Sequence, residues 1–339
     1  MNYYSTDDFA AVQKYDTHVH LNLDETSLIT QSMEDNFKLI TINVDVASEF
    51  PTIERQQEVA VALSKAFPTT VNFCCTFSVE NFNSDNWAEE TIAGIKNSVS
   101  KGAIAVKVWK NVGMELKDAV GNFVMIDHPK FESVLDFLAK NNIPLIGHLG
   151  EPKNCWLPVE QMTVQGDVNY FSKHPQYHMY LHPEYPSYED QINARDRMLA
   201  KHAGLQFIGA HLGSLEWNVD ELAKRLDRFP NMAVDTASRI SHLQHEAKTN
   251  GRKIYDFCIK YQDRIVYGTD IIIWPASDPV DTKKEAHDIR LRHWNFFTSG
   301  ETMEVPKVDG AFKGLKLPQN VVDKIYRSNA EKWFPALVK

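Results

Sequence analysis

Two histidines separated by one residue lie near the start of the chain, in the stretch KYDTHVHLN at residues 14–22. If this stretch is a β-strand, His18 and His20 lie on one face and Val19 lies on the other. An imidazole is polar and can gain a proton near neutral pH, so two neighbouring rings suit an apolar core poorly. The spacing therefore predicts that both rings face a shared polar site.

Polar side chains of the same kind follow other apolar runs of the chain. Lys107 and Lys110 lie in AVKVWK, His148 in LIGH, His211 in IGAH and Asp270 in YGTD. Imidazole nitrogens together with a carboxylate are suitable ligands for a first-row metal ion, with Zn²⁺ favoured over Mn²⁺ or Fe²⁺. The predicted metal-binding residues are His18, His20, Lys107, His148, His211 and Asp270. Taken singly, each has an ordinary structural alternative, such as a helix cap for Asp270.

These residues can meet only if the fold gathers the ends of several strands. Eight short apolar runs rich in Val, Ile, Phe and Tyr have the composition of buried parallel strands. They span residues 15–20, 38–44, 70–78, 103–109, 143–148, 205–211, 231–236 and 264–270. Amphipathic helical patterns lie between them, at residues 51–66, 84–100, 129–142, 218–229, 251–262, 281–297 and 318–334. This alternation predicts an α/β protein with the (β/α)₈ TIM-barrel fold, in which the C-terminal strand ends converge on one axis.

An open doubly wound sheet is the alternative fold. It would normally place a glycine-rich turn after the first strand, whereas this chain has HLNLDET there, without a glycine. No linker or repeat divides the chain, so we expect a single domain over residues 1–339. A long insertion at residues 149–188, rich in aromatic residues, Pro and His, follows the fifth strand. It is expected on the C-terminal face of the barrel as a lid or substrate wall.

Composition excludes several classes of partner. The chain has 339 residues and a net charge of −9, and its Lys and Arg residues form no long run. Nucleic acid and anionic membrane surfaces are therefore not expected as partners. Four cysteines without CxxC spacing, an N-terminus unlike a signal peptide and no apolar run long enough to span a bilayer indicate a cytoplasmic protein with reduced thiols. The expected partner is a small-molecule substrate, and homo-oligomers are common among such barrels.

Five motifs together resemble the amidohydrolase superfamily, in its amidohydrolase-2 branch. They are DTHVH, AVKVW, IGHLG, GAHLG and YGTD, and they cover residues 16–270 in the order of that family. The resemblance implies a TIM barrel that binds one or two metal ions. Some members carry a lysine at the fourth strand that CO₂ converts to a bridging carbamate. Lys107 can take that role if its amine loses a proton in a buried site, or it can stay an ordinary amine that binds substrate or pairs with an acid.

The resemblance also implies a metal-dependent hydrolase of an amide, ester or lactone bond. Zn²⁺ lowers the pKa of a bound water to about 7. Asp270 then takes the proton of this water and delivers it to the leaving group, and His211 is free for acid–base work if one metal binds. The alternative is a metal-dependent non-oxidative decarboxylase of an unsaturated or aromatic acid. A barrel that only binds ligands is a third class, and the full set of metal ligands argues against it.

Residues near the strand ends are candidates for substrate binding. Arg239, in DTASRISH, can hold a carboxylate with its guanidinium, or form an ion pair with a neighbouring acid. Glu151 can hydrogen-bond a hydroxyl group or a ligating histidine, and Lys110 lies beside the fourth strand. His242 and His245 follow the seventh strand, from which they can reach the mouth of the barrel, but a surface position is expected.

Overall fold

The computed structural model describes residues 2–46 and 49–338 and has one large parallel sheet. Its nine strands follow the order β8-β7-β6-β5-β4-β3-β2-β1-β9. The strands are β1 (Lys14–His20), β2 (Phe37–Ile42), β3 (Val71–Thr76), β4 (Val106–Val108), β5 (Leu145–Gly147), β6 (Phe207–Gly209), β7 (Met232–Asp235), β8 (Ile265–Val266) and β9 (Ile271–Ile272). From β1 to β8, strands that follow one another along the chain lie side by side in the sheet, and all nine strands are parallel.

The sheet curls because its two edge strands belong to one segment of the chain. β8 pairs with β7, and β9 pairs with β1. Between them, the backbone N–H of Thr17 donates to Tyr267 O at 3.0 Å, and that of Asp270 donates to His18 O at 2.7 Å. The segment 265–273 thus bonds to both β7 and β1. The fold is α/β with a curled parallel sheet, as the alternation of apolar runs and helices predicts.

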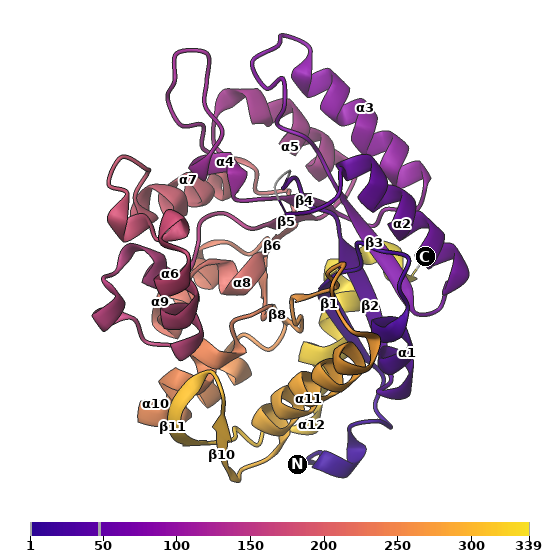
Figure 1. The fold of residues 1–339 in the computed structure, drawn as a ribbon, viewed down its shortest axis with the longest axis vertical. Coiled ribbons are helices and arrows are strands. Elements are labelled where there is room, and N and C mark those ends of the chain that lie inside the picture. The colour runs from indigo at the N-terminus through magenta and orange to yellow at the C-terminus, as the bar shows by residue number, and fades with distance from the viewer. Residues whose placement is uncertain (1, 47–48, 339) are drawn as a thin grey trace.

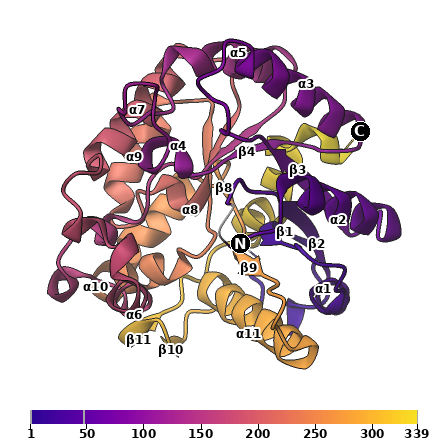
Figure 2. The ribbon, with the colours of Figure 1, turned by 45° about the horizontal axis from the view of Figure 1, so that its top comes forward.

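The helices cover the outer face of this sheet (Figures 1 and 2). The long ones are α1 (Ser27–Glu34), α2 (Ile53–Ala66), α3 (Trp87–Ser100), α5 (Glu132–Lys140), α7 (Tyr188–Lys201), α9 (Val219–Arg228), α10 (Ile240–Lys260) and α11 (Pro279–Thr298). The other helices are α6 (Gln165–Lys173), in the insertion, and the short α4 (Asn111–Met114), α8 (Ala210–Gly213), α12 (Gln319–Asp323) and α13 (Asn329–Trp333). Each long helix buries one stripe, as α9 does with Val219, Leu222 and Leu226.

Apolar side chains fill the space inside the curl. Ile40, Cys74, Ile146 and Ile208 come from four different strands and belong to one buried cluster. Trp333, at the end of α13, packs into the same cluster. A larger cluster fills the layer between the sheet and the helices. The interior is therefore a packed core, and polar side chains are left to gather at the strand ends.

The structure differs from the sequence prediction in several elements. The helix predicted over 251–262 begins earlier, as α10, and the one predicted over 318–334 is divided into α12, a π-helical turn and α13. Helix α1 and an antiparallel hairpin of β10 (Thr302–Val305) and β11 (Val308–Lys313) were not predicted. The expected strand over residues 264–270 is interrupted. Thr236 Oγ1 accepts from the N–H of Gly268 at 3.1 Å and donates to its carbonyl at 3.0 Å, which replaces strand pairing with side-chain hydrogen bonds. The interruption leaves Asp270 on a bend beside the strand ends.

The segment 149–188 folds as a series of 3₁₀ turns around α6 and leads into α7. Across residues 2–46 and 49–338, no helix combines the length and apolar character needed to cross a bilayer.

Candidate metal centre

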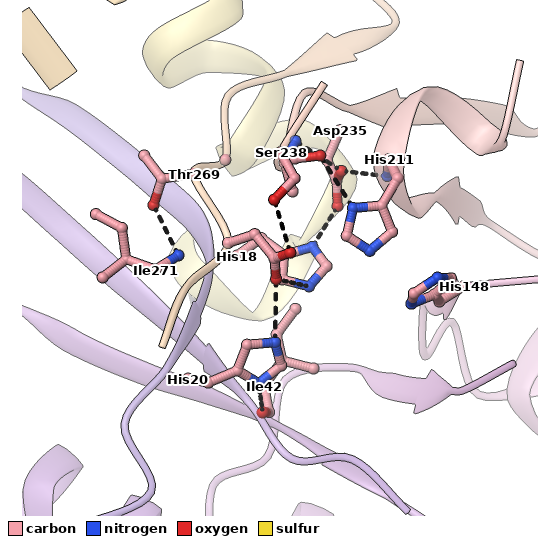
Figure 3. A network of polar contacts seen from close by, with 12 residues as sticks. His18, His20, Ile42, His148, His211, Asp235, Ser238, Thr269 and Ile271 are labelled. Carbon is pink, nitrogen blue, oxygen red and sulfur yellow. Dashed lines mark hydrogen bonds and ion pairs between the residues drawn. The ribbon is translucent and has the colours of Figure 1, made fainter. Parts of the chain in front are cut away.

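Three histidines at the strand ends are each held through Nδ1. The Nδ1 of His18 lies 2.7 Å from Asp235 Oδ2, that of His20 lies 2.8 Å from Ile42 O, and that of His211 lies 2.9 Å from Ala237 O. Carbonyl and carboxylate oxygens accept hydrogen bonds, so each Nδ1 carries the proton and donates it. The lone pair of a neutral imidazole is then on Nε2, and Figure 3 shows these rings around one shared space. This is the arrangement by which proteins prepare histidines for a metal ion.

Asp270 completes this group. Its Oδ1 lies 3.3 Å from His20 Nε2 and 3.5 Å from His18 Nε2, and the ligand atoms of the three residues lie within 4.8 Å of one another. Burial disfavours the charged carboxylate, but the surrounding histidines outweigh that effect and hold the pKa of Asp270 well below its usual range. Burial also lowers the pKa of His20 and His211. Neutral imidazoles at His20 and His211 and an ionised carboxylate at Asp270 are the protonation states that bind metals.

Two buried nitrogen atoms beside this group lack hydrogen-bond partners among the described residues, Lys107 Nζ and His148 Nε2. Lys107 is 1% exposed, and burial lowers its pKa to about 8. Burial lowers the pKa of His148 to about 3, and its ring centroid lies 4.2 Å from that of His211. A buried polar atom left unpaired costs about 1–3 kcal/mol. These orphan atoms fit a site built for a cation or for a modified lysine.

All nine predicted site residues line one cavity of about 330 Å³. They are His18, His20, Lys107, Lys110, His148, Glu151, His211, Arg239 and Asp270. The compact group of possible ligands contains only His18, His20 and Asp270, so the structure brings half of the six predicted metal ligands into one tight cluster and the others to its edge. The cavity has the size of small-molecule sites.

The substrate-side candidates differ in their contacts. Lys110 and Glu151 form an ion pair with each other. Burial alone would raise the pKa of Glu151, but Lys110 outweighs it and the pKa is lowered. Arg239 forms no ion pair among the described residues, its Nη1 donates to Ser238 O at 3.3 Å, and its Nε has no partner. Arg239 is therefore the cation of this group without a direct ion pair among the described residues, although its charge lowers the pKa of Asp167 and acts on Glu216.

Residues of the insertion and of neighbouring loops complete the cavity wall. Phe50, Trp109, Tyr170, Phe171 and Trp274 give it an aromatic lining. Phe50 connects this lining with the metal centre, because its ring centroid lies 5.3 Å from that of His20 and 5.5 Å from that of Trp274. Planar apolar surfaces beside charged groups suit a substrate with a flat or apolar part.

A buried hydrogen bond ties the insertion to the main body. Asp167 of α6 lies 3.0 Å from His242 Nε2 of α10 and accepts from Asn154 Nδ2 at 2.9 Å. Asp167 also lines the cavity. Burial raises the pKa of Asp167, but His242 outweighs this and lowers it to about 2. The expectation that His242 lies at the surface is wrong, because this carboxylate from the insertion covers it, leaving it 3% exposed.

Sequence reasoning missed two residues that position the centre. Asp235 binds His18 and also accepts from the backbone N–H of His211 at 2.7 Å. Ser238 Oγ donates to Asp270 Oδ2 at 2.9 Å. Asp235 is the last residue of β7, so the same strand-end position that marked the histidines was its signal.

The backbone at this centre adopts a conformation that side chains disfavour. His211, Ser238 and Asp270 have φ values of 59°, 56° and 67°, in the left-handed region. Such residues cost of order 1–3 kcal/mol each and persist where the surroundings hold them. Here the hydrogen bonds of Asp235, Ser238 and His18 supply that support. Strain of this kind concentrates at functional sites.

Comparison with known proteins shows the family to which this chain belongs. A family model described as amidohydrolase, of the amidohydrolase-2 type, matches residues 81–336. The chain belongs to the amidohydrolase-2 family. No curated protein matches this amidohydrolase.

Solved structures resemble the amidohydrolase over nearly its whole length. A 2,6-dihydroxybenzoate decarboxylase from Rhizobium is 15% identical, with a TM-score of 0.54 over 95% of this chain and 98% of the other. A structure named amidohydrolase II is 12% identical, with a TM-score of 0.52 over 95% of this chain and 100% of the other. At these identities the likeness concerns the fold.

Proposed function

We propose that this amidohydrolase is a metal-dependent hydrolase that cleaves an amide, ester or lactone bond of a small molecule. The observation that carries the proposal is the set of three imidazoles whose Nδ1 atoms are anchored, which leaves their Nε2 lone pairs beside the carboxylate of Asp270. The proposal includes a single (β/α)₈ barrel domain with the insertion 149–188 as a wall of the substrate site. Asp167, Tyr170 and Phe171 of that insertion line the cavity.

His18, His20 and Asp270 would hold the first metal ion, and His148, His211 and Lys107 would hold or adjoin a second. A bound divalent ion would lower the pKa of its water to about 7 and polarise a carbonyl oxygen. The ion need not be zinc, because nitrogen and carboxylate donors also suit Mn²⁺ and Fe²⁺. The buried, unpaired amine of Lys107, with its pKa of about 8, suits conversion to a carbamate.

Protein side chains would then transfer the proton from the attacking water to the leaving group. Oδ1 of Asp270 faces the histidine nitrogens, so Oδ2, held by Ser238, is the oxygen that takes a proton from the attacking water. The same carboxyl later gives the proton to the leaving group. His211 has its Nδ1 proton committed to Ala237 and a lowered pKa, so its Nε2 acts as a ligand or a base. Arg239, without an acidic partner, would hold a substrate carboxylate.

Metal analysis tests the centre. We expect wild-type protein purified without chelator to hold one or two equivalents of a divalent metal by elemental analysis. His18→Asn should remove most of it, and His242→Asn, a buried histidine outside the ligand set, should retain it. Lys107→Met should lower a content of two equivalents toward one if the lysine bridges the ions. Wild-type protein that takes up no metal, or a His18→Asn variant with normal content, would contradict the proposal.

Decarboxylation is the second candidate function, and two observations favour it. The aromatic lining of the cavity suits a flat acid, and a decarboxylase shares the fold. An assay of CO₂ release from aromatic and unsaturated acids, run beside hydrolysis of amides, esters and lactones, separates the two reactions. Hydrolysis without CO₂ release supports the first proposal, and CO₂ release without hydrolysis replaces it with the second.

A further inference from the structure

A second cavity lies behind the metal centre, between α10, α11 and the β10–β11 hairpin. Its volume is about 310 Å³, and we call it the α10–α11 cavity. Figures 1 and 2 show the hairpin beside the two helices that form the other walls. The residues that matter below are Ser238, Ser241, Gln244, Glu285, Asp288, Arg292, His293 and Lys307, all of which line it. None of them except Ser238 lines the metal-centre cavity.

The N-terminus of α10 opens into this cavity. Ile240 and Ser241 are the first residues of this helix of 21 residues, and both line the cavity. Their backbone N–H groups have no acceptor among the described residues, and the preceding Arg239 provides no side-chain cap. Free N–H groups and the positive end of the helix dipole attract an anion.

Two polar side chains of α10 itself add a second observation to the free N–H groups. Gln244 is 3% exposed and Ser241 is 8% exposed, yet neither side chain has a hydrogen-bond partner in residues 2–46 and 49–338. Neither residue belongs to the group of fully enclosed polar atoms without a partner, so the Gln244 amide and the Ser241 hydroxyl remain accessible from the cavity. Both side chains line the cavity, so their polar atoms are available to a molecule inside it.

Two cations face the same space without partners. Neither the Arg292 guanidinium nor the Lys307 ammonium forms an ion pair within the described part of the chain. Of the two acids of the lining, Asp288 is paired with Lys284 at 3.1 Å and Glu285 is exposed at the rim. His293 is held through Nδ1 by the Tyr267 hydroxyl at 3.1 Å. Lys307 is exposed, as Glu285 is, whereas Arg292 is half-buried, so the inner part of the cavity combines the unpaired Arg292 guanidinium with unpaired donors.

We propose that the α10–α11 cavity binds a small oxyanion, a carboxylate or a phosphate. The N–H groups of Ile240 and Ser241 and the amide of Gln244 donate to its oxygens, and Arg292 and Lys307 balance its charge. Ser238 lines both cavities and donates to Asp270. Its side chain therefore connects the proposed anion site with Asp270, the proposed proton-transfer group. The site is separate from the proposed metal centre and stands whether or not the reaction is hydrolysis.

Calorimetric titration with inorganic phosphate, and separately with acetate, tests the proposal on the full-length protein as purified. We expect saturable binding of at least one of the two. Arg292→Gln and Gln244→Leu should each weaken it by about tenfold, because a hydrogen bond to a charged group contributes about that factor. Lys313→Gln, on the same hairpin and outside the lining, is the matched control and should bind as wild type does.

An anion could instead bind in the metal-centre cavity, where Arg239 is the proposed carboxylate-binding residue. The variant Arg239→Gln distinguishes that site from the α10–α11 cavity. Binding that is lost with Arg292→Gln or Gln244→Leu and kept with Arg239→Gln supports the proposal, and the preferred anion then identifies phosphate or carboxylate as the ligand. Binding that responds to Arg239→Gln alone overturns it, as does the absence of saturable binding by both anions. A crystal structure with the bound anion at the Ile240 and Ser241 N–H groups would confirm the assignment directly.

Discussion

The two ends of strand β1 use buried charge in opposite ways. At its start, the Lys14 ammonium donates to the carbonyls of Phe9 and Val12. Two residues on, Asp16 accepts from Thr269 and forms an ion pair with Arg290 at 2.9 Å, with both side chains fully buried. At its end, the Nε2 atoms of His18 and His20 face a shared space and the carboxylate of Asp270.

Within the seven residues of β1, the buried charges at the start stabilise the fold, and the polar groups at the end are available to a ligand. The polar atoms at the start of β1 already have partners in the protein, so a ligand has nothing to add there. The nitrogens at its end are oriented by Asp235 and Ile42 and left available on the other side. Buried polarity alone does not mark a site, whereas oriented groups without partners do.

The sharpest test of the contrast is Asp270→Asn. We expect turnover of the wild-type substrate to fall by about 10²–10⁴-fold, because the amide cannot accept the proton. Unfolding in urea should show no loss of stability, since Ser238 can still donate to the amide oxygen. Retained activity would remove Asp270 from the reaction, and an unfolded variant would show that the strand end also serves stability.

Asp16→Asn tests the other end of the strand. Removing the charge opposite Arg290 leaves an unpaired buried cation, which should cost about 3–5 kcal/mol in the free energy of unfolding. Urea unfolding measures this loss. Asp256→Asn, which breaks an exposed pair with Arg252, is the control and should change stability by less than about 1 kcal/mol. Equal effects of the two substitutions would refute the distinction between the ends.

Asp235→Asn weakens the orientation of His18 without touching the ligand atoms. We expect metal affinity to fall by about 10–100-fold, the usual effect of losing a carboxylate behind a ligating histidine. Competition with a chromogenic chelator measures the affinity. Unchanged affinity would show that the backbone alone fixes the His18 ring.

Acidity should destabilise the metal-free protein through His148, which follows β5 at the site. Burial lowers the pKa of folded His148 to about 3, whereas an unfolded histidine titrates near pH 6.5. Between these values the unfolded chain binds more protons, so stability falls as the pH drops from 6.5 toward 3. In His148→Gln this slope should be smaller, by at most about 1.4 kcal/mol per pH unit. Urea unfolding from pH 5 to 7 measures it, and identical slopes would contradict the cause.

The sequence allowed the α/β class and the family to be predicted because strand-forming runs and strand-end motifs are local signals. The histidines, Lys107 and Asp270 each follow such a run, and all of them line one cavity. Their roles as ligands and in proton transfer stay predictions.

Other features depend on contacts between distant segments. The partners of His18 and Asp270 are Asp235 and Ser238, each more than 30 residues away along the chain. Only the pairing of β7 with β8, and the bonding of the segment 265–273 to β1, brings them together. His242 is buried because Asp167 of the insertion reaches it, and no periodicity indicates that pair. The β10–β11 hairpin was not predicted, because only two of its side chains, Val308 and Phe312, are buried and they form no alternating apolar pattern.

The left-handed backbone at His211, Ser238 and Asp270 has a consequence for laboratory evolution. Glycine adopts this conformation without the penalty that a side chain incurs, so glycine at any of the three positions would relax the main chain. Selection for heat resistance alone would therefore favour variants in which the proposed catalytic machinery is erased. A screen for robust forms of this enzyme should score turnover alongside melting temperature, or hold these three codons fixed.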